Sequence, residues 1–481
     1  MLGIYFASQF AAYEWRFKRI QRLLVLVPYL VPNFVLATAY VVAWNPATGL
    51  LNPVLKFPNG LYGIVGMTVL FGVVHVPVAF LMLEEKIRRI DSSLREAARL
   101  SGAGTLTIFR RIELPLLWPT VGAATALCFA LNISAFAIPS WIGAPEKSYP
   151  LTYRIYQALQ VGGHEGMPLA TAYSVILFAI VVPALFIAAY TRRNERKFQT
   201  VSGKGARRAP RIRSPRTAAV FQTVFWVSQT VLWIAPLTAL FVSTFVPPGC
   251  LQANGLACFA DFTTRSYSYV LFELPETSIA FKGSFLYGTL SAIIIVLLCV
   301  FSLMAFSKNP VLLQALEWIF SLPAATPGAI IALGLIVTYS GRFEINLYNT
   351  AGIVVMAFVI KHANLSFQTL RTGLANISVS LLEAARLSGA GTRQVWTKIV
   401  LPILWPEMTG GFFLVLVPIL GELTMSIFLV SPSFRSIGTL LFDLQDYADQ
   451  ASAAALSIIL VVAVLALNET ARLVSKGRLG Y

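Results

Sequence analysis

The chain has 481 residues, of which 57% are hydrophobic and 12% charged, with a mean hydropathy of +0.72 and a net charge of +16. A water-soluble protein of this composition would lack the polar surface needed to cover its core. These values therefore exclude a soluble enzyme or binding protein and indicate an integral membrane protein.

Ten apolar runs approach the roughly 20 residues that a helix needs to cross a bilayer. In chain order we expect membrane spans near residues 22–45, 61–83, 119–141, 170–190, 221–246, 284–306, 316–338, 351–369, 408–430 and 452–473. The predicted fold class is therefore all-α, a polytopic protein of about ten transmembrane helices in a lipid bilayer.

The basic excess is concentrated between the fourth and fifth spans. Residues 191–217 carry ten Lys or Arg against one acid, Glu195. With this segment in the cytoplasm, only seven basic residues fall in external loops, namely Lys56, Lys147, Arg154, Arg265, Lys282, Arg342 and Arg435. That bias follows the positive-inside rule, so the charge orients the protein in its membrane and does not indicate nucleic-acid binding. The N-terminus, this linker and the C-terminus are predicted to be cytoplasmic.

An internal repeat divides the chain. Residues 96–119 match residues 383–406 at an offset of 287, with 16 of 24 positions identical. A long-period repeat in an apolar chain indicates two equivalent halves. We therefore predict a first half at 1–190, a basic cytoplasmic linker at 191–220 and a second half at 221–481.

The correspondence extends upstream of the repeat. Pro28-x-x-x-Pro32 lies opposite Pro323-x-x-x-Pro327 at an offset of 295, so the halves contain four and six spans. Residues 1–14 then resemble the cytoplasmic end of a second span, and about 75 residues of the second half have no counterpart. Either the protein starts further upstream or it has lost two helices. We favour the upstream start, because a partial helix is a poor beginning for a membrane protein; a native short half would instead suit a role in assembly only.

Each copy of the repeat carries local signals for two short helices joined by a turn. A Ser-x-x-Glu capping box starts the first helix, a glycine ends it in a left-handed conformation, and a threonine caps the second. These residues are Ser93, Glu96, Gly102 and Thr105 in the first copy and Ser380, Glu383, Gly389 and Thr392 in the second. A short capped helix is barely stable alone, so we expect a docking partner; a mere connector would not explain the identity of the copies.

The repeated pattern resembles the EAA loop of binding-protein-dependent ABC importer permeases. The matching residues are Glu96, Ala97, Ala98, Gly102, Ile112, Leu114 and Pro115, and again Glu383, Ala384, Ala385, Gly389, Ile399, Leu401 and Pro402. Over nearly the whole chain the architecture is similar to the fused two-half permeases of the ferric-iron and thiamine type. The shortage of two spans in the first half is the one large departure.

The resemblance implies that the protein lies in a bacterial inner membrane. It also implies that each loop is a coupling helix in a cleft of a cytoplasmic ATPase, with two ATPase copies in total. It also implies a periplasmic binding protein that delivers the substrate, and ferric iron as the substrate, with thiamine, polyamines (spermidine or putrescine) or phosphonate as alternatives. No Gly-x-x-x-x-Gly-Lys-Ser/Thr phosphate loop occurs in the sequence, so ATP hydrolysis falls to the partner. No catalytic residue, metal site or cofactor is predicted for this chain.

Ionisable residues within predicted spans are candidates for the substrate route. Glu422 either attracts a cation or bonds neighbouring helices, and Lys361 either reaches polar groups or pairs with Glu422. His75 and His362 are equivalent in the repeat, which favours a helix-positioning role. One membrane carboxylate is too few for the relay of a proton-driven transporter. Three histidines, with His164, are too scattered for an intramembrane enzyme.

External segments carry three further features. Asp443, Asp446 and Asp449 share a helical face that is either solvated or contacts the binding protein. The tyrosine-rich stretches 149–156 and 267–269 could serve the same contact. Cys250 and Cys258 share one loop, and their spacing allows a disulfide without requiring it. Cys128 and Cys299 fall within spans and are predicted to be small packing residues.

Overall fold

The computed structural model describes residues 1–12, 17–52, 61–88, 90, 92–161, 163–194, 215–246, 250, 258, 262–307, 309–341, 345–431, 434–446 and 450–474. In this part of the chain the regular structure is helical, apart from two isolated bridges. The all-α prediction is therefore confirmed. Packing divides the chain into two units, Met1–Ala158 with Ala172–Val242, and Leu159–Thr171 with Ser243–Tyr481.

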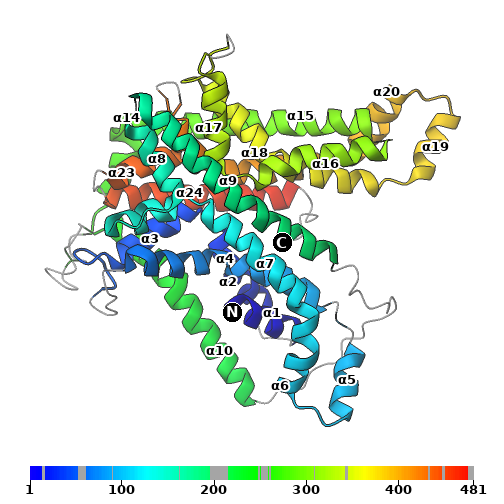
Figure 1. Cartoon of the computed structure of the whole chain (residues 1–481), viewed down its shortest axis with the longest axis horizontal. Coiled ribbons are helices and arrows are strands. Elements are labelled where there is room, and N and C mark those ends of the chain that lie inside the picture. The colour runs from blue at the N-terminus through cyan, green and yellow to red at the C-terminus, as the bar shows by residue number, and fades with distance from the viewer. Residues whose placement is uncertain are drawn as a thin grey trace. The chain divides into compact units, whose positions relative to one another are not determined.

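The first unit is built around the long helix α4 (Figure 1). Its helices are α1 (Leu2–Ala12), α2 (Lys18–Leu30), α3 (Asn33–Trp44), α4 (Gly63–Arg88), α5 (Ser92–Leu100), α6 (Thr105–Ile108), α7 (Leu114–Ile133), α8 (Leu151–Val161), α9 (Gly163–Asn194), α10 (Pro215–Gln229) and α11 (Ala235–Ser243). The end of α8 and the start of α9, within Leu159–Thr171, and the last residue of α11 are assigned to the second unit. Phe6 and Phe10 of α1 are fully buried beside Phe221 and Phe225 of α10. A span that follows the linker in sequence thus packs with the first unit.

The second unit is built around α18 (Figure 1). Its helices are α13 (Arg265–Ser268), α14 (Pro275–Lys282), α15 (Gly288–Phe306), α16 (Pro310–Ala325), α17 (Gly328–Tyr339), α18 (Ala351–Ala375), α19 (Val379–Leu387), α20 (Thr392–Val395), α21 (Leu401–Leu420), α22 (Thr424–Phe428), α23 (Ile437–Asp446) and α24 (Gln450–Val474). Helices α15, α16 and α21 pack against α18. The α18–α21 contact is close because Gly411 has no side chain; a Cβ there would lie 2.8 Å from the Ser366 Oγ.

Eight helices in the described part of the chain are long and apolar enough to cross a membrane, and two bent helix pairs raise the number to ten if each pair is one span. This agrees with the expected ten. The bent pairs are α2 with α3 and α16 with α17, at 95° and 103°. The predicted spans at 22–45 and 316–338 therefore each consist of two helices joined at a bend, which the hydropathy did not indicate.

Equivalent prolines explain both bends. Pro32 and Pro327 are the N-cap residues directly before the second helix of each pair, where a missing N–H costs no helical hydrogen bond. The residue before a proline is driven out of the helical region, and Val31 and Thr326 both take extended backbone angles. An uninterrupted apolar run therefore becomes two helices.

The predicted span at 408–430 is also interrupted. Helix α21 ends at Leu420, and the short helix α22 starts at Thr424, so Glu422 lies at a break between helices. The first-half counterpart, α7, likewise ends at Ile133, within the predicted span at 119–141.

Candidate functional site

The two repeated segments fold as matching elbows. In the first, α5 turns into a helix that runs continuously from Thr105 to Ile133. In the second, α19 turns into a helix that runs from Thr392 to Leu420. Figure 1 shows α19 and α20 at the far end of α16 and α18, and α5 and α6 at the end of α7. Each elbow therefore joins two long helices of its unit.

The same turn ends the first helix of both elbows. Gly102 and Gly389 take the left-handed conformation, with φ of 81° and 82°, as the sequence predicted. Two backbone hydrogen bonds of 2.9–3.0 Å close each turn, from Ala103 to Ala98 and Gly102 to Arg99, and from Ala390 to Ala385 and Gly389 to Arg386. This is the Schellman arrangement, and the acceptor of its longer-range hydrogen bond is the second alanine of each Glu-Ala-Ala motif.

The predicted N-terminal caps were wrong. Helix α5 already begins at Ser92 and α19 at Val379, so Ser93 and Ser380 lie inside the first turn. Ser378 is the N-cap of α19 because it still has extended backbone angles, and its Oγ lies 2.6 Å from that of Ser380. The glutamates of the motif are consequently not the partners of a capping serine.

The predicted threonine caps were also displaced by one residue. Thr105 and Thr392 are the first helical residues of α6 and α20. In the second elbow, the N-cap is Gly391, whose N–H donates to the Gln394 side chain at 3.0 Å. The side-chain amide of Gln394 thus satisfies a backbone donor that no threonine reaches.

A π-turn lets each helix pass its Leu-Pro pair. Phe109–Glu113 and Trp396–Val400 form these turns, in which the N–H groups of Leu114 and Leu401 bond five residues back. A proline inside an α-helix clashes with the carbonyl four residues earlier, and the wider turn relieves that clash. Ile112 and Ile399 belong to the π-turns, and Pro115 and Pro402 follow directly. The elbow is therefore continuous with a membrane-spanning helix.

The first helix of each elbow exposes the same side chains. Glu96 and Glu383 are exposed, as are Ala97 and Ala384. Leu100 and Leu387 are 91% and 90% exposed at the helix end. Nine-residue helices with solvated apolar ends gain little stability from the rest of the chain. Their surface is suited to burial against another protein.

Lys361 holds the bend between α16 and α17. Its Nζ donates to the backbone oxygens of Ala324 and Thr326, at 3.0 and 2.5 Å. These carbonyls end α16, where the helix dipole favours a positive charge. No ion pair within 4 Å joins Lys361 to Glu422 among the described residues, so the expectation that Lys361 reaches polar groups in the bundle fits the geometry better than the pairing.

Glu422 holds the next break. One carboxylate oxygen accepts from the N–H of Met425 at 2.7 Å, and its backbone oxygen accepts from the Ser426 hydroxyl at 3.0 Å. These contacts tie the break to α22. They favour the helix-bonding interpretation of Glu422 over a free carboxylate on the route.

The two equivalent histidines differ in environment. The Nδ1 of His75 lies 3.0 Å from the backbone oxygen of Phe71, one turn earlier in the same helix. His362 is 8% exposed, and its Nε2 has no hydrogen-bond partner among the described residues. The side chain of His164 is outside the described part. No three His, Cys, Asp or Glu residues gather as a metal site in the described ranges.

The aspartates and tyrosines that the sequence analysis assigned to external segments make contacts within the fold. Arg435 donates to the half-buried Asp443, while Asp446 is exposed and Asp449 lies outside the described residues. Burial raises the pKa of the Asp443 carboxyl, and the Arg435 hydrogen bond and charge partly offset this. The rings of Tyr149 and Tyr153 stack at 5.6 Å. Only part of this surface is therefore available to a partner.

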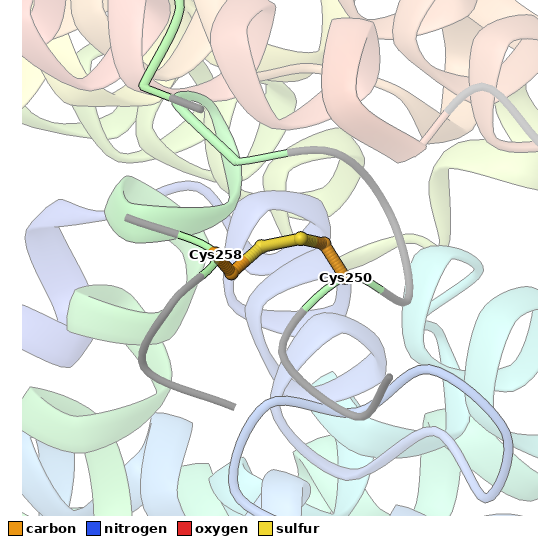
Figure 2. Close-up of a disulfide and its surroundings, with 2 residues drawn as sticks. All are labelled: Cys250 and Cys258. Atoms are coloured by element: carbon orange, nitrogen blue, oxygen red, sulfur yellow. A yellow bond between two sulfur atoms is a disulfide. The ribbon is translucent and has the colours of Figure 1, made fainter. Parts of the chain in front are cut away.

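The two cysteines of the loop after α11 form a disulfide. A disulfide links Cys250 and Cys258, whose Cα atoms are 5.7 Å apart, within the usual range for such bonds (Figure 2). Cys128 and Cys299 carry free thiols, and Cys299 is buried, as packing residues would be.

Sequence reasoning missed one pair of interactions. Glu84 of α4 bonds to Arg22 of α2, and Arg371 of α18 bonds to Glu317 of α16. Extending the repeat offsets to charged positions would have found both.

Comparison with known proteins places this architecture. The family model described as "Binding-protein-dependent transport system inner membrane component" matches residues 1–197 and 300–476. Relatives include a probable ABC transporter permease from Sinorhizobium fredii, y4fN, 24% identical over 81% of this chain and 68% of its own length. The Fe(3+)-transport system permease FbpB 2 of Haemophilus influenzae is 24% identical over 80% of this chain and 72% of its length.

A third relative matches part of the chain. The permease PhnV of Salmonella typhi, assigned to 2-aminoethylphosphonate transport, is 30% identical over 56% of this chain and 98% of its own length. The family match covers most of the chain and includes both elbows. The chain therefore belongs to the family of inner-membrane components of binding-protein-dependent transport systems.

Proposed function

We propose that this permease subunit imports ferric iron and that each elbow docks on one copy of a cytoplasmic ATPase. The main support for this docking is the close similarity of the two elbows. Both have the same turn, the same exposed glutamate and the same exposed terminal leucine. Two equal surfaces suit two copies of one partner, because each copy presents the same complement.

The position of each elbow between two long helices supports a role in transmitting force into the membrane. Helix α19 follows α18 and leads directly into α21, so a pull on it acts on both helices at once. The first elbow relates to α4 and α7 in the same way. When ATP closes the ATPase dimer, the elbows move together and the halves rock between inward- and outward-facing states.

The orientation and division of the chain belong to the same proposal. The basic distribution supports cytoplasmic elbows, linker and termini. The repeat supports halves at 1–190 and 221–481, joined by a linker at 191–220. A periplasmic binding protein then meets the opposite face, where the exposed Asp446 offers a carboxylate for ionic contact.

The substrate is inferred from relatives. The Haemophilus relative is named as an Fe(3+)-transport permease, and a ferric transport permease of Actinobacillus pleuropneumoniae aligns over 97% of this chain at 22% identity. The likeness to PhnV makes 2-aminoethylphosphonate the second candidate. A periplasmic binding protein would deliver either substrate, so the ligand of that binding protein would identify which of the two is imported.

Crosslinking tests the docking. Leu100→Cys and Leu387→Cys should each capture the ATPase during transport, whereas Val161→Cys, at an exposed site remote from the elbows in sequence, should not. Uptake that continues while neither elbow captures the ATPase would contradict the proposal.

Uptake by cells tests the substrate. Cells with the intact transporter should accumulate radioactive ferric iron, and deleting this chain should abolish that accumulation. Labelled 2-aminoethylphosphonate is the comparison. Uptake of the phosphonate alone would replace iron by the second candidate.

A further inference from the structure

An ion pair joins equivalent helices in each unit. In the first, the buried Glu84 of α4 accepts from Arg22 of α2, with 3.1 Å between Nε and Oε2, and from Arg88 at 2.5 Å. In the second, Arg371 of α18 contacts Glu317 of α16 at 2.6 Å. Each pair ties a bent helix to the long helix that leads into the elbow.

The two pairs occupy the same places in the repeat. Position 84 corresponds to 371 at the offset of 287, and position 22 corresponds to 317 at the offset of 295. Neighbouring apolar positions correspond too, since Leu83 and Leu370 are both buried. The signs are reversed, however, because α4 carries the acid in the first unit and α18 carries the base in the second.

Sign reversal has a consequence for assembly. If α2 packed against α18, Arg22 would meet Arg371; if α16 packed against α4, Glu317 would meet Glu84. Either exchange replaces an attraction by a repulsion between like charges. The native arrangement satisfies both pairs, so the charges distinguish correct from exchanged helix pairing.

We propose that these two ion pairs are a pairing code that keeps each bent helix with the long helix of its own half. A chain with two similar halves risks exchanging equivalent elements during folding. Apolar helix surfaces alone discriminate poorly in a bilayer, where lipid is as apolar as the partner helix. Because the acid is on the long helix in one half and on the bent helix in the other, each bent helix is attracted only to the long helix of its own half.

Reversing the charges in one half tests the code. Arg22→Glu with Glu84→Arg keeps the attraction between α2 and α4. Both bent helices then carry the acid and both long helices the base, so an exchanged pairing is no longer repulsive. Glu317→Arg with Arg371→Glu likewise gives the two halves the same arrangement of charges. Reversing both halves together restores opposite senses. All versions carry Arg88→Ala, because Ala375 occupies the equivalent position and Arg88 would repel an arginine at 84.

Crosslinks in the full-length membrane protein report the pairing. In a background with Cys128 and Cys299 replaced by Ala, a bis-maleimide is applied to Val25→Cys with Leu83→Cys for native pairing, and to Val25→Cys with Leu370→Cys for exchange. The chain with Arg88→Ala but no charge reversal gives the reference yield of each crosslink. Each single-half reversal should raise the exchange crosslink several-fold, and the combined reversal should return it to baseline.

A purely local role gives a different pattern. The exchange crosslink of the combined reversal would then be as high as that of the worse single-half reversal, or its accumulation in the membrane as poor. Either result would overturn the pairing code. Arg22→Met with Glu84→Met removes the first pair without burying a new charge. It should raise the exchange crosslink by a smaller factor, and an unchanged crosslink would also contradict the proposal.

Discussion

The two elbows match turn for turn, whereas the helix breaks inside the two units are held differently. Gly102 and Gly389 close the same Schellman turn with the same hydrogen bonds. In the second unit, Lys361 and Glu422 hold the breaks with charged groups. The equivalent positions in the first half are Val74 and Ala135.

The contrast separates two kinds of constraint. In the function proposed above, each elbow docks on one copy of the same partner, and two copies of one partner require two elbows of equal shape. A helix break inside a unit only has to satisfy its own backbone groups. The first unit does this near Ala135 with a hydroxyl, since Thr152 donates to the Ala135 oxygen at 2.6 Å. Interior solutions can therefore diverge while the elbows stay alike.

The largest effect is expected from breaking either elbow at its glycine. Gly389→Val forces a β-branched residue into a left-handed conformation that costs about 1–2 kcal/mol even for ordinary residues. A Cβ added at 389 or 102 would meet no other described residue within 4 Å, apart from its chain neighbours, so the strain is in the backbone alone. ATP-dependent uptake should fall roughly tenfold or more, with membrane insertion intact.

Two neighbours sharpen this prediction. Gly389→Asn should retain more uptake than Gly389→Val, because asparagine tolerates the left-handed region. Gly391→Ala should be nearly neutral, since Gly391 has φ of −68° and open space around it. Full uptake by Gly389→Val, or equal loss in Gly391→Ala, would refute the strain argument.

The glycine turns also show which features a sequence can predict. A glycine at the end of a short helix specifies its own backbone conformation, so Gly102 and Gly389 could be placed from sequence. Likewise, apolar runs of sufficient length predicted the membrane spans. The bends at Pro32 and Pro327 were missed because hydropathy is continuous across them, although both prolines were visible.

Long-range polar contacts were less accessible. Lys361 bonds to carbonyls 35 and 37 residues earlier, and no residue pattern distinguishes this from a pairing with Glu422. The capping boxes failed because Ser-x-x-Glu also fits within a first turn. Local motifs placed helix ends to within one or two residues, whereas the hydrogen-bond partners of residues distant in sequence could not be predicted from local patterns.

The next largest effect is expected at Glu422, where charge and hydrogen bonding can be separated. Glu422→Ala removes the acceptor for the Met425 N–H and should destabilise the break by about 1–3 kcal/mol. Glu422→Gln keeps an acceptor oxygen and should retain most uptake. If Gln abolished uptake as fully as Ala while the protein stayed folded, the carboxylate would have a role on the cation route.

A smaller loss is expected at Lys361. Lys361→Met leaves the Ala324 and Thr326 carbonyls without their donor, which should lower the midpoint of thermal unfolding in detergent. Val74→Met at the equivalent first-half position is the matched control and should change this midpoint less, because no donor is lost. Equal midpoints for Lys361→Met and the native chain would show that the bend needs no cation.

The smallest effect is expected at Asp443, outside the membrane spans. Burial raises the pKa of this carboxyl above its ordinary value of about 3.9, so the folded protein binds a proton more readily than the unfolded chain. Its contribution to stability is therefore present at low pH and is lost as the pH rises from about 3.9 through the folded-state pKa. Asp443→Asn keeps an acceptor for Arg435 but removes this dependence. Unfolding midpoints measured across that pH window should fall less steeply for the variant, and parallel curves would show that the Arg435 contact cancels the cost of burial.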